Sequence, residues 1–175
     1  MSRSAPGVRH HSGRVWFFLG MALVLGLDQV TKFLIMREFA LYESRQIIPG
    51  LFSLTFLTNT GAAFGILAGH PTWWRQAFFI GVGLVALAVI VWLQGRLGPH
   101  RRWYTVSLAL IGGGALGNLV DRVRFGAVVD FLDFYIGSHH WPPFNVADSA
   151  ICVGVALFLV LQFSGDNQQQ NIQES

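Results

Sequence analysis

The chain has 175 residues, of which 53% are hydrophobic and only 12% are charged, and its mean hydropathy is +0.49. Because about a quarter of the residues in a soluble domain are charged, this composition excludes an ordinary soluble protein and predicts a membrane protein of one domain. The net charge of +3 does not indicate a nucleic-acid partner, because the arginines are scattered among apolar segments and form no basic stripe.

The first apolar segment, residues 15–36, follows a polar tail at 1–14 and is long enough to span a bilayer as a helix. A cleaved signal peptide fits less well, because no small-x-small cleavage site follows. Asp28, Thr31 and Lys32 recur at i, i+3 and i+4, which places them on one helix face. The spacing is consistent with an ion pair that stabilises the helix end, with a role in shaping a site, or with both.

Residues 37–69 are too polar and too broken to span the membrane. Within them, residues 51–58 nearly alternate between apolar and polar, which predicts a half-buried strand after the turn signal Pro49-Gly50. We expect a small β-sheet at the membrane surface. The small residues of 59–65 permit either a close backbone approach or a simple turn into the next helix.

Three further apolar segments, at about 73–93, 103–120 and 144–163, complete a prediction of four membrane-spanning helices. Gly113 and Gly117 form a small-xxx-small pair, which lets a neighbouring helix come close. The last twelve residues, 164–175, are rich in glutamine and predict a disordered tail.

Polar residues recur at helical spacing at one end of the third and fourth spans. These residues are Asn118, Asp121 and Arg122 on the third span and Asn145, Asp148, Ser149 and Cys152 on the fourth. Antiparallel spans bring these ends to the same side as the polar end of the first span. A weak arginine bias, six against four, predicts that both termini lie in the cytoplasm and that the polar cluster lies outside.

Two carboxylates are the best candidates for chemistry at this cluster. The sequence has neither the H-E-x-x-H motif of zinc proteases nor the G-x-S-x-G elbow of serine hydrolases. Asp130 follows a strand-like Ala127-Val-Val run and Asp148 lies in the first turn of a helix, so two elements can deliver their carboxylates to one point. One carboxyl of such a pair stays protonated while the other acts as a base toward water.

Asp121 and Asp133 are the other candidate carboxylates. Asp121 is expected to pair with Arg122 or Arg124, and Asp133 is expected on a loop. We expect a loop at 136–143 and no metal site at the adjacent His139 and His140 within it. Cys152, inside an apolar run, is expected to be a buried small residue rather than a nucleophile.

Five motifs, in order along residues 15–163, together resemble the lipoprotein signal peptidases, also called signal peptidase II. They are Asp28-Gln-Val-Thr-Lys32, Asn59-Thr-Gly-Ala-Ala-Phe-Gly65, Gly113-Gly-Ala-Leu-Gly-Asn118 with Asp121-Arg122, Gly126-Ala-Val-Val-Asp-Phe131, and Phe144-Asn-Val-Ala-Asp148. The resemblance implies an all-α membrane protein whose four transmembrane helices carry a small extracytoplasmic β-sheet between the first and second helices. It also implies an intramembrane aspartyl endopeptidase of the bacterial inner membrane, which cuts prolipoproteins before their diacylglyceryl-modified cysteine.

By the same resemblance, Asp130 and Asp148 form the catalytic dyad at the outer, periplasmic interface. The residues expected to bind substrate or support the site are Asp28, Lys32, Asn59, Gly61, Asn118, Asp121, Arg122 and Asn145. The expected partners are a lipidated prolipoprotein and membrane lipid, with no metal, no other cofactor and no nucleic acid, and the protein is expected to be a monomer. The alternative is a small proton- or ion-coupled carrier that uses the same acids, although a carrier places its acids near the membrane midplane.

Overall fold

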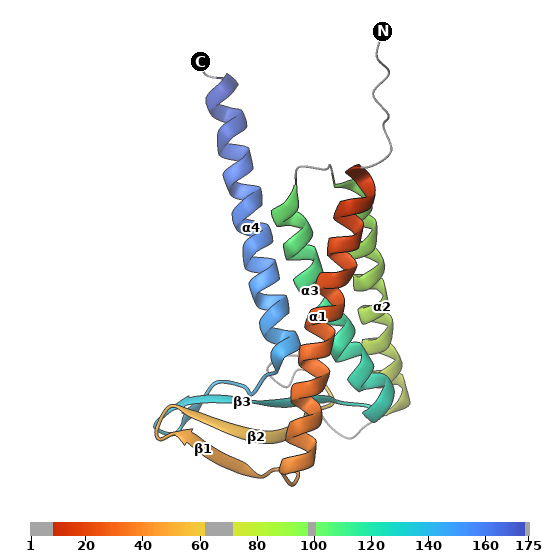
Figure 1. The fold of residues 1–175 in the computed structure, drawn as a ribbon. Helices are drawn as coiled ribbons and strands as arrows, with labels where there is room; N and C mark the ends of the chain where they lie inside the picture. Colours follow the sequence, from red (N-terminus) through yellow and green to blue (C-terminus); the bar gives the residue numbers. More distant parts are fainter. Residues whose placement is uncertain (1–8, 62–71, 98–100, 174–175) are drawn as a thin grey trace.

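The computed structural model describes residues 9–61, 72–97 and 101–173, and four long helices run side by side through it (Figure 1). The helices are α1 (Arg9–Glu38), α2 (Trp73–Arg96), α3 (Arg102–Phe125) and α4 (Val146–Gln173). Four segments in them are long and apolar enough to cross a membrane: Gly13–Glu38, Trp73–Arg96, Arg102–Phe125 and Val146–Ser164. The prediction of four membrane-spanning helices is therefore confirmed.

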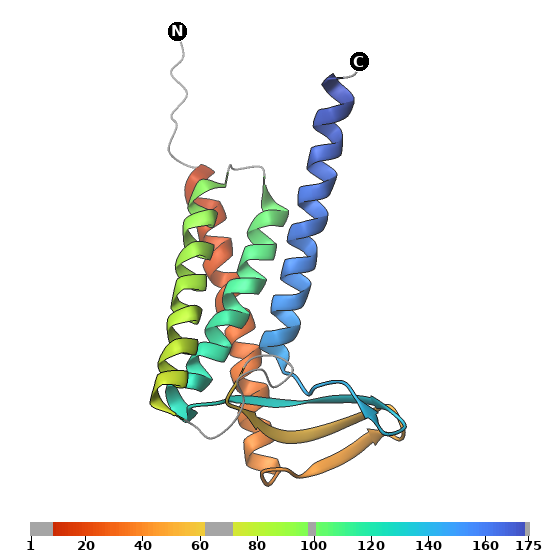
Figure 2. The same cartoon turned by 180° about the vertical axis from the view of Figure 1, so that it is seen from behind.

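Helix α3 lies at the centre and packs against each of the other three helices (Figures 1 and 2). Its glycines make this close packing possible, because any larger residue would clash. A Cβ added at Gly113 would lie only 2.7 Å from Cβ of Val24 on α1. A Cβ at Gly117 would lie 2.5 Å from Oδ2 of Asp28 on the same helix. The small-xxx-small pair thus brings α1 and α3 close together, as predicted.

The outer surfaces of the helices carry large exposed apolar side chains, as expected for helices that face lipid. Cys152 is also exposed, so the prediction that it is buried is wrong. The reason is that α4 packs mainly on α3 and leaves most of its own circumference open.

An antiparallel four-stranded sheet lies across one end of the helix bundle and projects to one side of it (Figures 1 and 2). Its strands, in spatial order, are β1 (Ser44–Ile48), β2 (Phe52–Asn59), β3 (Val128–Ile136) and β4 (His139–His140). The predicted small sheet between α1 and α2 is confirmed, and the Pro49-Gly50 turn joins its strands with Gly50 at φ +76°. The sheet also recruits β3 and β4 from the chain between α3 and α4.

Three local expectations differ from the structure. Asp133 lies within β3 rather than on a loop, because β3 continues through nine residues against β2. The expected loop at 136–143 contains the short strand β4. Helix α4 continues to Gln173, so the structure has helix where a disordered tail was expected. Residues 62–65 of the motif that begins at Asn59 lie outside the described residues.

Candidate active site

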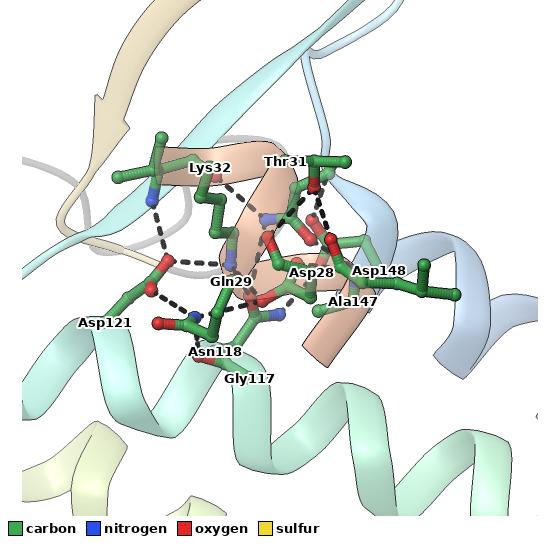
Figure 3. Close-up of polar contacts among 12 residues, drawn as sticks. Asp28, Gln29, Thr31, Lys32, Gly117, Asn118, Asp121, Ala147 and Asp148 are labelled. Atoms are coloured by element: carbon green, nitrogen blue, oxygen red, sulfur yellow. Dashed lines mark hydrogen bonds and ion pairs between the residues drawn. The ribbon is translucent and has the colours of Figure 1, made fainter. Parts of the chain in front are cut away.

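A cluster of buried polar side chains lies where the ends of α1, α3 and α4 meet the start of β3 (Figure 3). Six of its members have at most 9% of their surface exposed: Asp28, Lys32, Asn118, Asp121, Asp130 and Asn145. Burial of polar and charged groups is costly unless they find partners. The contacts below show that each of them has a partner.

Helix α4 begins with a reciprocal cap that includes Asp148. Asn145 directly precedes the helix, and its Oδ1 accepts a hydrogen bond of 2.9 Å from the backbone N–H of Asp148. In return, Oδ2 of Asp148 accepts a bond of 3.3 Å from the backbone N–H of Asn145. This arrangement is a capping box, which satisfies two backbone donors that the helix itself leaves free. The cap fixes the carboxylate of Asp148 at the buried start of α4.

Asp130 reaches the same place from β3. Its side chain is 4% exposed, and its Oδ1 accepts a hydrogen bond of 2.8 Å from Nδ2 of Asn145. The side chain of Asn59, at the end of β2, also hydrogen-bonds to it. A β-bulge adds one residue to β2 between the pairs Leu54↔Leu132 and Leu57↔Asp130. Bulges of this kind redirect side chains beside active sites.

The structure therefore brings Asp130 and Asp148 together on one residue, Asn145, as the sequence analysis anticipated. Burial, and after it the nearby charge of Asp148, together raise the pKa of Asp130 from 3.8 to about 7. The hydrogen bonds from Asn145 and Asn59 oppose this rise. A carboxyl group with this pKa can hold a proton near neutral pH, so the pair can supply one acid and one base.

Asn118 orients the other carboxylate. Its Nδ2 donates a hydrogen bond of 2.7 Å to Oδ1 of Asp148, and its Oδ1 accepts one of 3.1 Å from Nζ of Lys32. An ammonium group can only donate hydrogen bonds, so Lys32 requires the amide oxygen on its own side. The amide nitrogen of Asn118 must then face Asp148 (Figure 3).

Lys32 is held between two carboxylates. Its Nζ lies 2.9 Å from Oδ2 of Asp28 and 2.6 Å from Oδ2 of Asp121. The predicted i, i+4 pair of Asp28 and Lys32 is confirmed. The expected pairing of Asp121 with an arginine is wrong, because the close packing of α1 on α3 places the ammonium of Lys32 against it.

Arg122 instead holds the segment that follows β2. Its Nη2 donates to the backbone oxygen of Gly61 at 3.1 Å, and its Nη1 donates to the backbone oxygen of Asn118 at 3.3 Å. Asn59 fixes the same turn, because its Oδ1 accepts a bond of 2.9 Å from the N–H of Gly61. Gly61 is thus held by both Asn59 and Arg122. Asn59 also contacts Asp130, and Arg122 also contacts the backbone of Asn118, so this segment borders the buried cluster.

One side chain of the cluster, Gln29, was not among the residues predicted for the site. Gln29 donates from Nε2 to Oδ1 of Asp121 at 2.9 Å and to Oδ2 of Asp28 at 3.2 Å (Figure 3). Its position in the sequence could have indicated this role, because Gln29 lies beside Asp28 and three residues before Lys32, on the polar side of an otherwise apolar helix. An amide there serves two carboxylates of the cluster.

The two histidines lie elsewhere, at the end of β3 that is remote from Asp130. Nδ1 of His140 lies 2.9 Å from Oδ1 of Asp133, so this candidate carboxylate is paired with a histidine there, away from Asp130. Within the described ranges, no group of three or more histidine, cysteine, aspartate or glutamate side chains is arranged to hold a metal ion.

Comparison with known proteins covers most of the chain. The family model for signal peptidase (SPase) II matches residues 20–164. The lipoprotein signal peptidase of Geobacter metallireducens is 51% identical over 155 residues, which cover 89% of this chain and 94% of that protein. The lipoprotein signal peptidase of Geobacter sulfurreducens is 56% identical over 142 residues, or 79% of this chain and 88% of that protein.

The fold agrees with these sequence matches. A solved structure described as a bacterial membrane enzyme, obtained by the in meso method at 2.3 Å resolution, superimposes with a TM-score of 0.78 at 33% sequence identity. The match covers 87% of this chain and 90% of the other. The family model spans the helices and strands that carry the buried cluster, the relatives and the solved structure cover most of the chain, and the chain therefore belongs to the signal peptidase II family.

Proposed function

We propose that this protein is an intramembrane aspartyl endopeptidase that removes the signal peptide of a prolipoprotein before its diacylglyceryl-modified cysteine. The substrate class follows from the lipoprotein signal peptidases that the chain resembles. The aspartyl mechanism is supported by one observation above all. Two carboxylates from different elements, the buried Asp130 on β3 and the half-buried Asp148 on α4, are both hydrogen-bonded to Asn145.

The reaction assigns a different role to each carboxyl group of the pair. The ionised carboxylate takes a proton from a water molecule, whose oxygen adds to the carbonyl carbon of the scissile amide. The protonated carboxyl donates its proton to the reacting amide, the C–N bond breaks, and the new amine leaves. The raised pKa of Asp130 makes it suited to hold that proton near neutral pH. Amide donors such as those of Asn118 and Asn145 keep both groups oriented.

The placement of the pair suits a substrate that stays in the membrane. Asp148 is in the first turn of α4, and Asp130 is on the sheet across the end of the bundle (Figure 1). The scissile bond can therefore meet the pair at the interface while the lipid chains and the apolar signal helix remain in the bilayer. We place the protein in the bacterial inner membrane as a monomer, with both termini cytoplasmic and the site on the periplasmic side.

A proton- or ion-coupled carrier is less consistent with this geometry. Carriers hold their acids near the midplane, often on interrupted helices. Here the two acids lie at one end of the bundle, and each span is a continuous helix over its described length. We therefore propose the peptidase alone.

The test is cleavage of a synthetic diacylated precursor peptide by the purified protein in lipid. We expect cleavage immediately before the modified cysteine and little cleavage of the same peptide with an unmodified cysteine. Asp130→Asn and Asp148→Asn should each nearly abolish cleavage, whereas the matched control Asp133→Asn, which removes a carboxylate from the same strand, should cleave normally. Cleavage by either dyad variant at close to the native rate would contradict the aspartyl mechanism.

A further inference from the structure

The carboxylates of Asp28 and Asp121 each hold a backbone amide that neighbours the proposed dyad. Oδ1 of Asp28 accepts a hydrogen bond of 2.9 Å from the N–H of Ala147, the residue before Asp148 (Figure 3). Oδ2 of Asp121 accepts one of 3.1 Å from the N–H of Val129, the residue before Asp130. The two contacts are alike although they come from different helices and reach different elements.

Lys32 connects these two carboxylates. Its ammonium group has three N–H donors, and three acceptors surround it: Asp28, Asp121 and Asn118. The first two contacts join the carboxylates that hold the backbone before each dyad member. The third orients the amide of Asn118 toward Asp148. The side chains of α1 and α3 that contact Asp148, or the backbone next to Asp130 and Asp148, are Asp28, Asn118 and Asp121. The buried ammonium group of Lys32 binds all three of them.

These three side chains do not reach the surface on which a substrate could lie. Asp28 is 0% exposed, Lys32 is 1% exposed and Asp121 is 1% exposed. A role in direct substrate binding, which the sequence left open for them, does not fit this burial. Their contacts lead inward, to the backbone that carries the dyad.

We infer that Asp28, Lys32 and Asp121 form a positioning unit, here called the ion triad, that sets the separation and orientation of Asp130 and Asp148. This inference rests on the proposed function, because it gives the triad a role only if those two residues perform the chemistry. Without Lys32, two carboxylates would face each other in a buried site and repel, which would shift the backbone at Ala147 and Val129. Displacements of about 1 Å at a catalytic centre are enough to lower a rate about a hundredfold.

The first arm of the test compares alanine with asparagine at the triad acids. Asparagine keeps an oxygen that can accept the backbone N–H, whereas alanine removes it. We expect Asp28→Ala and Asp121→Ala to lower kcat about 10- to 100-fold while KM for the diacylated peptide changes less than about threefold. Asp121→Asn should recover most of the lost kcat, because one amide oxygen in the place of Oδ2 can accept from both the N–H of Val129 and Nζ of Lys32. Asp28→Asn should recover less, because its amide nitrogen would face the ammonium of Lys32 when its oxygen accepts from Ala147.

The second arm uses charge compensation. Lys32→Met keeps the length of the side chain and removes its charge, so it should lower kcat strongly. Adding Asp121→Asn to Lys32→Met removes one of the two repelling carboxylates, and the double variant should be faster than Lys32→Met alone. A double variant as slow as the product of the two single effects would contradict the inference.

A control separates positioning from loss of stability. Leu108 is 2% exposed in the apolar core of α3, roughly 20 Å along the helix from Asp121. Leu108→Ala should lower the unfolding temperature as much as the triad variants do, with kcat of the folded protein unchanged. Triad variants that match Leu108→Ala in both respects, or that raise KM alone, would overturn the inference. Dyad variants measured in parallel identify the separate case in which the proposed function itself fails, because they would then cleave normally.

Discussion

At the scale of single residues, Asn145 serves two elements with the two ends of one amide group. Its oxygen caps α4 through the N–H of Asp148, and its nitrogen donates to Asp130. The cap stabilises the helix, whereas the donation orients a proposed catalytic group. Different substitutions can separate these two contributions.

We expect Asn145→Ser and Asn145→Ala to lower cleavage by similar factors, because both remove the donor to Asp130. Serine can still cap the helix with its hydroxyl oxygen, whereas alanine cannot. Asn145→Ala should therefore be less stable than Asn145→Ser by about 1 kcal/mol. Chemical unfolding and peptide cleavage of the two variants measure the two effects. Equal stability of both would show that the cap contributes little.

The pKa of Asp130 gives a pH dependence for cleavage. The proposed mechanism needs one proton on the dyad, and Asp130 holds its proton up to a pH of about 7. Cleavage should therefore decline as the pH rises above about 7, where this proton is lost, and should also decline in acid, where the second carboxyl becomes protonated. The measurement is kcat between about pH 5 and about pH 9. A flat profile across this range would contradict the mechanism.

The same pKa affects stability with the opposite sign from an ordinary paired aspartate. Asp130 releases its proton near 3.8 in the unfolded chain but only near 7 in the folded protein. Between these values the folded state binds more protons, so the free energy of unfolding falls as the pH rises. Asp130→Asn removes the free-energy cost of ionising a buried carboxyl group and keeps the shape of the side chain. We expect this inactive variant to melt at a higher temperature than the native protein at about pH 8 and at a similar temperature near pH 4.

At the scale of elements, the packing of α1 on α3 controls the buried cluster. A Cβ at Gly117 would lie 2.5 Å from Oδ2 of Asp28, whose carboxylate already binds Lys32 and Ala147. Gly117→Ala should therefore lower stability by about 1 to 3 kcal/mol and reduce cleavage at the same time. The matched control is Gly81→Ala on α2, where nothing lies within 4 Å of the added Cβ. Cleavage and unfolding temperature should be near native in that control.

The periodicity of the sequence predicted the helices and their polar faces, because both follow from spacing within one element. Asp28, Asn118 and Asp148 were thus placed on faces that meet in the structure. The partner of Asp121 was not predictable, since it depends on which neighbouring helix lies against α3. The extension of β3 as far as Asp133 was missed for a similar reason, because it depends on pairing with β2, where Ser53, the partner of Asp133, lies 80 residues earlier in the chain.

At the scale of the whole molecule, the ends of the bundle differ in kind. The sheet and the buried cluster lie at one end, and α1 begins and α4 ends at the other (Figure 1). From the weak arginine bias we expect the second end to face the cytoplasm. The sidedness of the proposed site depends on this assignment.

Topology reporters can test the assignment. A reporter fused after Ser175 should be active in the cytoplasm, and one inserted at the turn residue Gly137, between β3 and β4, should be active outside. Gly137 has nothing within 4 Å of an added Cβ, so an insertion there should be tolerated. The reverse pattern would place the sheet and the dyad in the cytoplasm.

The close packing of α3 also limits how the helix of a signal peptide can approach the buried cluster. Two packed helices need about 8–10 Å between their axes. At Gly113 and Gly114 the backbone of α3 already lies against the backbones of α1 and α4, so these two helix interfaces have no room for another helix. A helical signal peptide could enter these two interfaces only by separating the helices, which would break the contacts that hold Asp28 and Asp148. Under the proposed function, we therefore expect the signal peptide to rest against the outside of the bundle and to unwind at the interface, so that only an extended stretch of a few residues reaches Asp130 and Asp148.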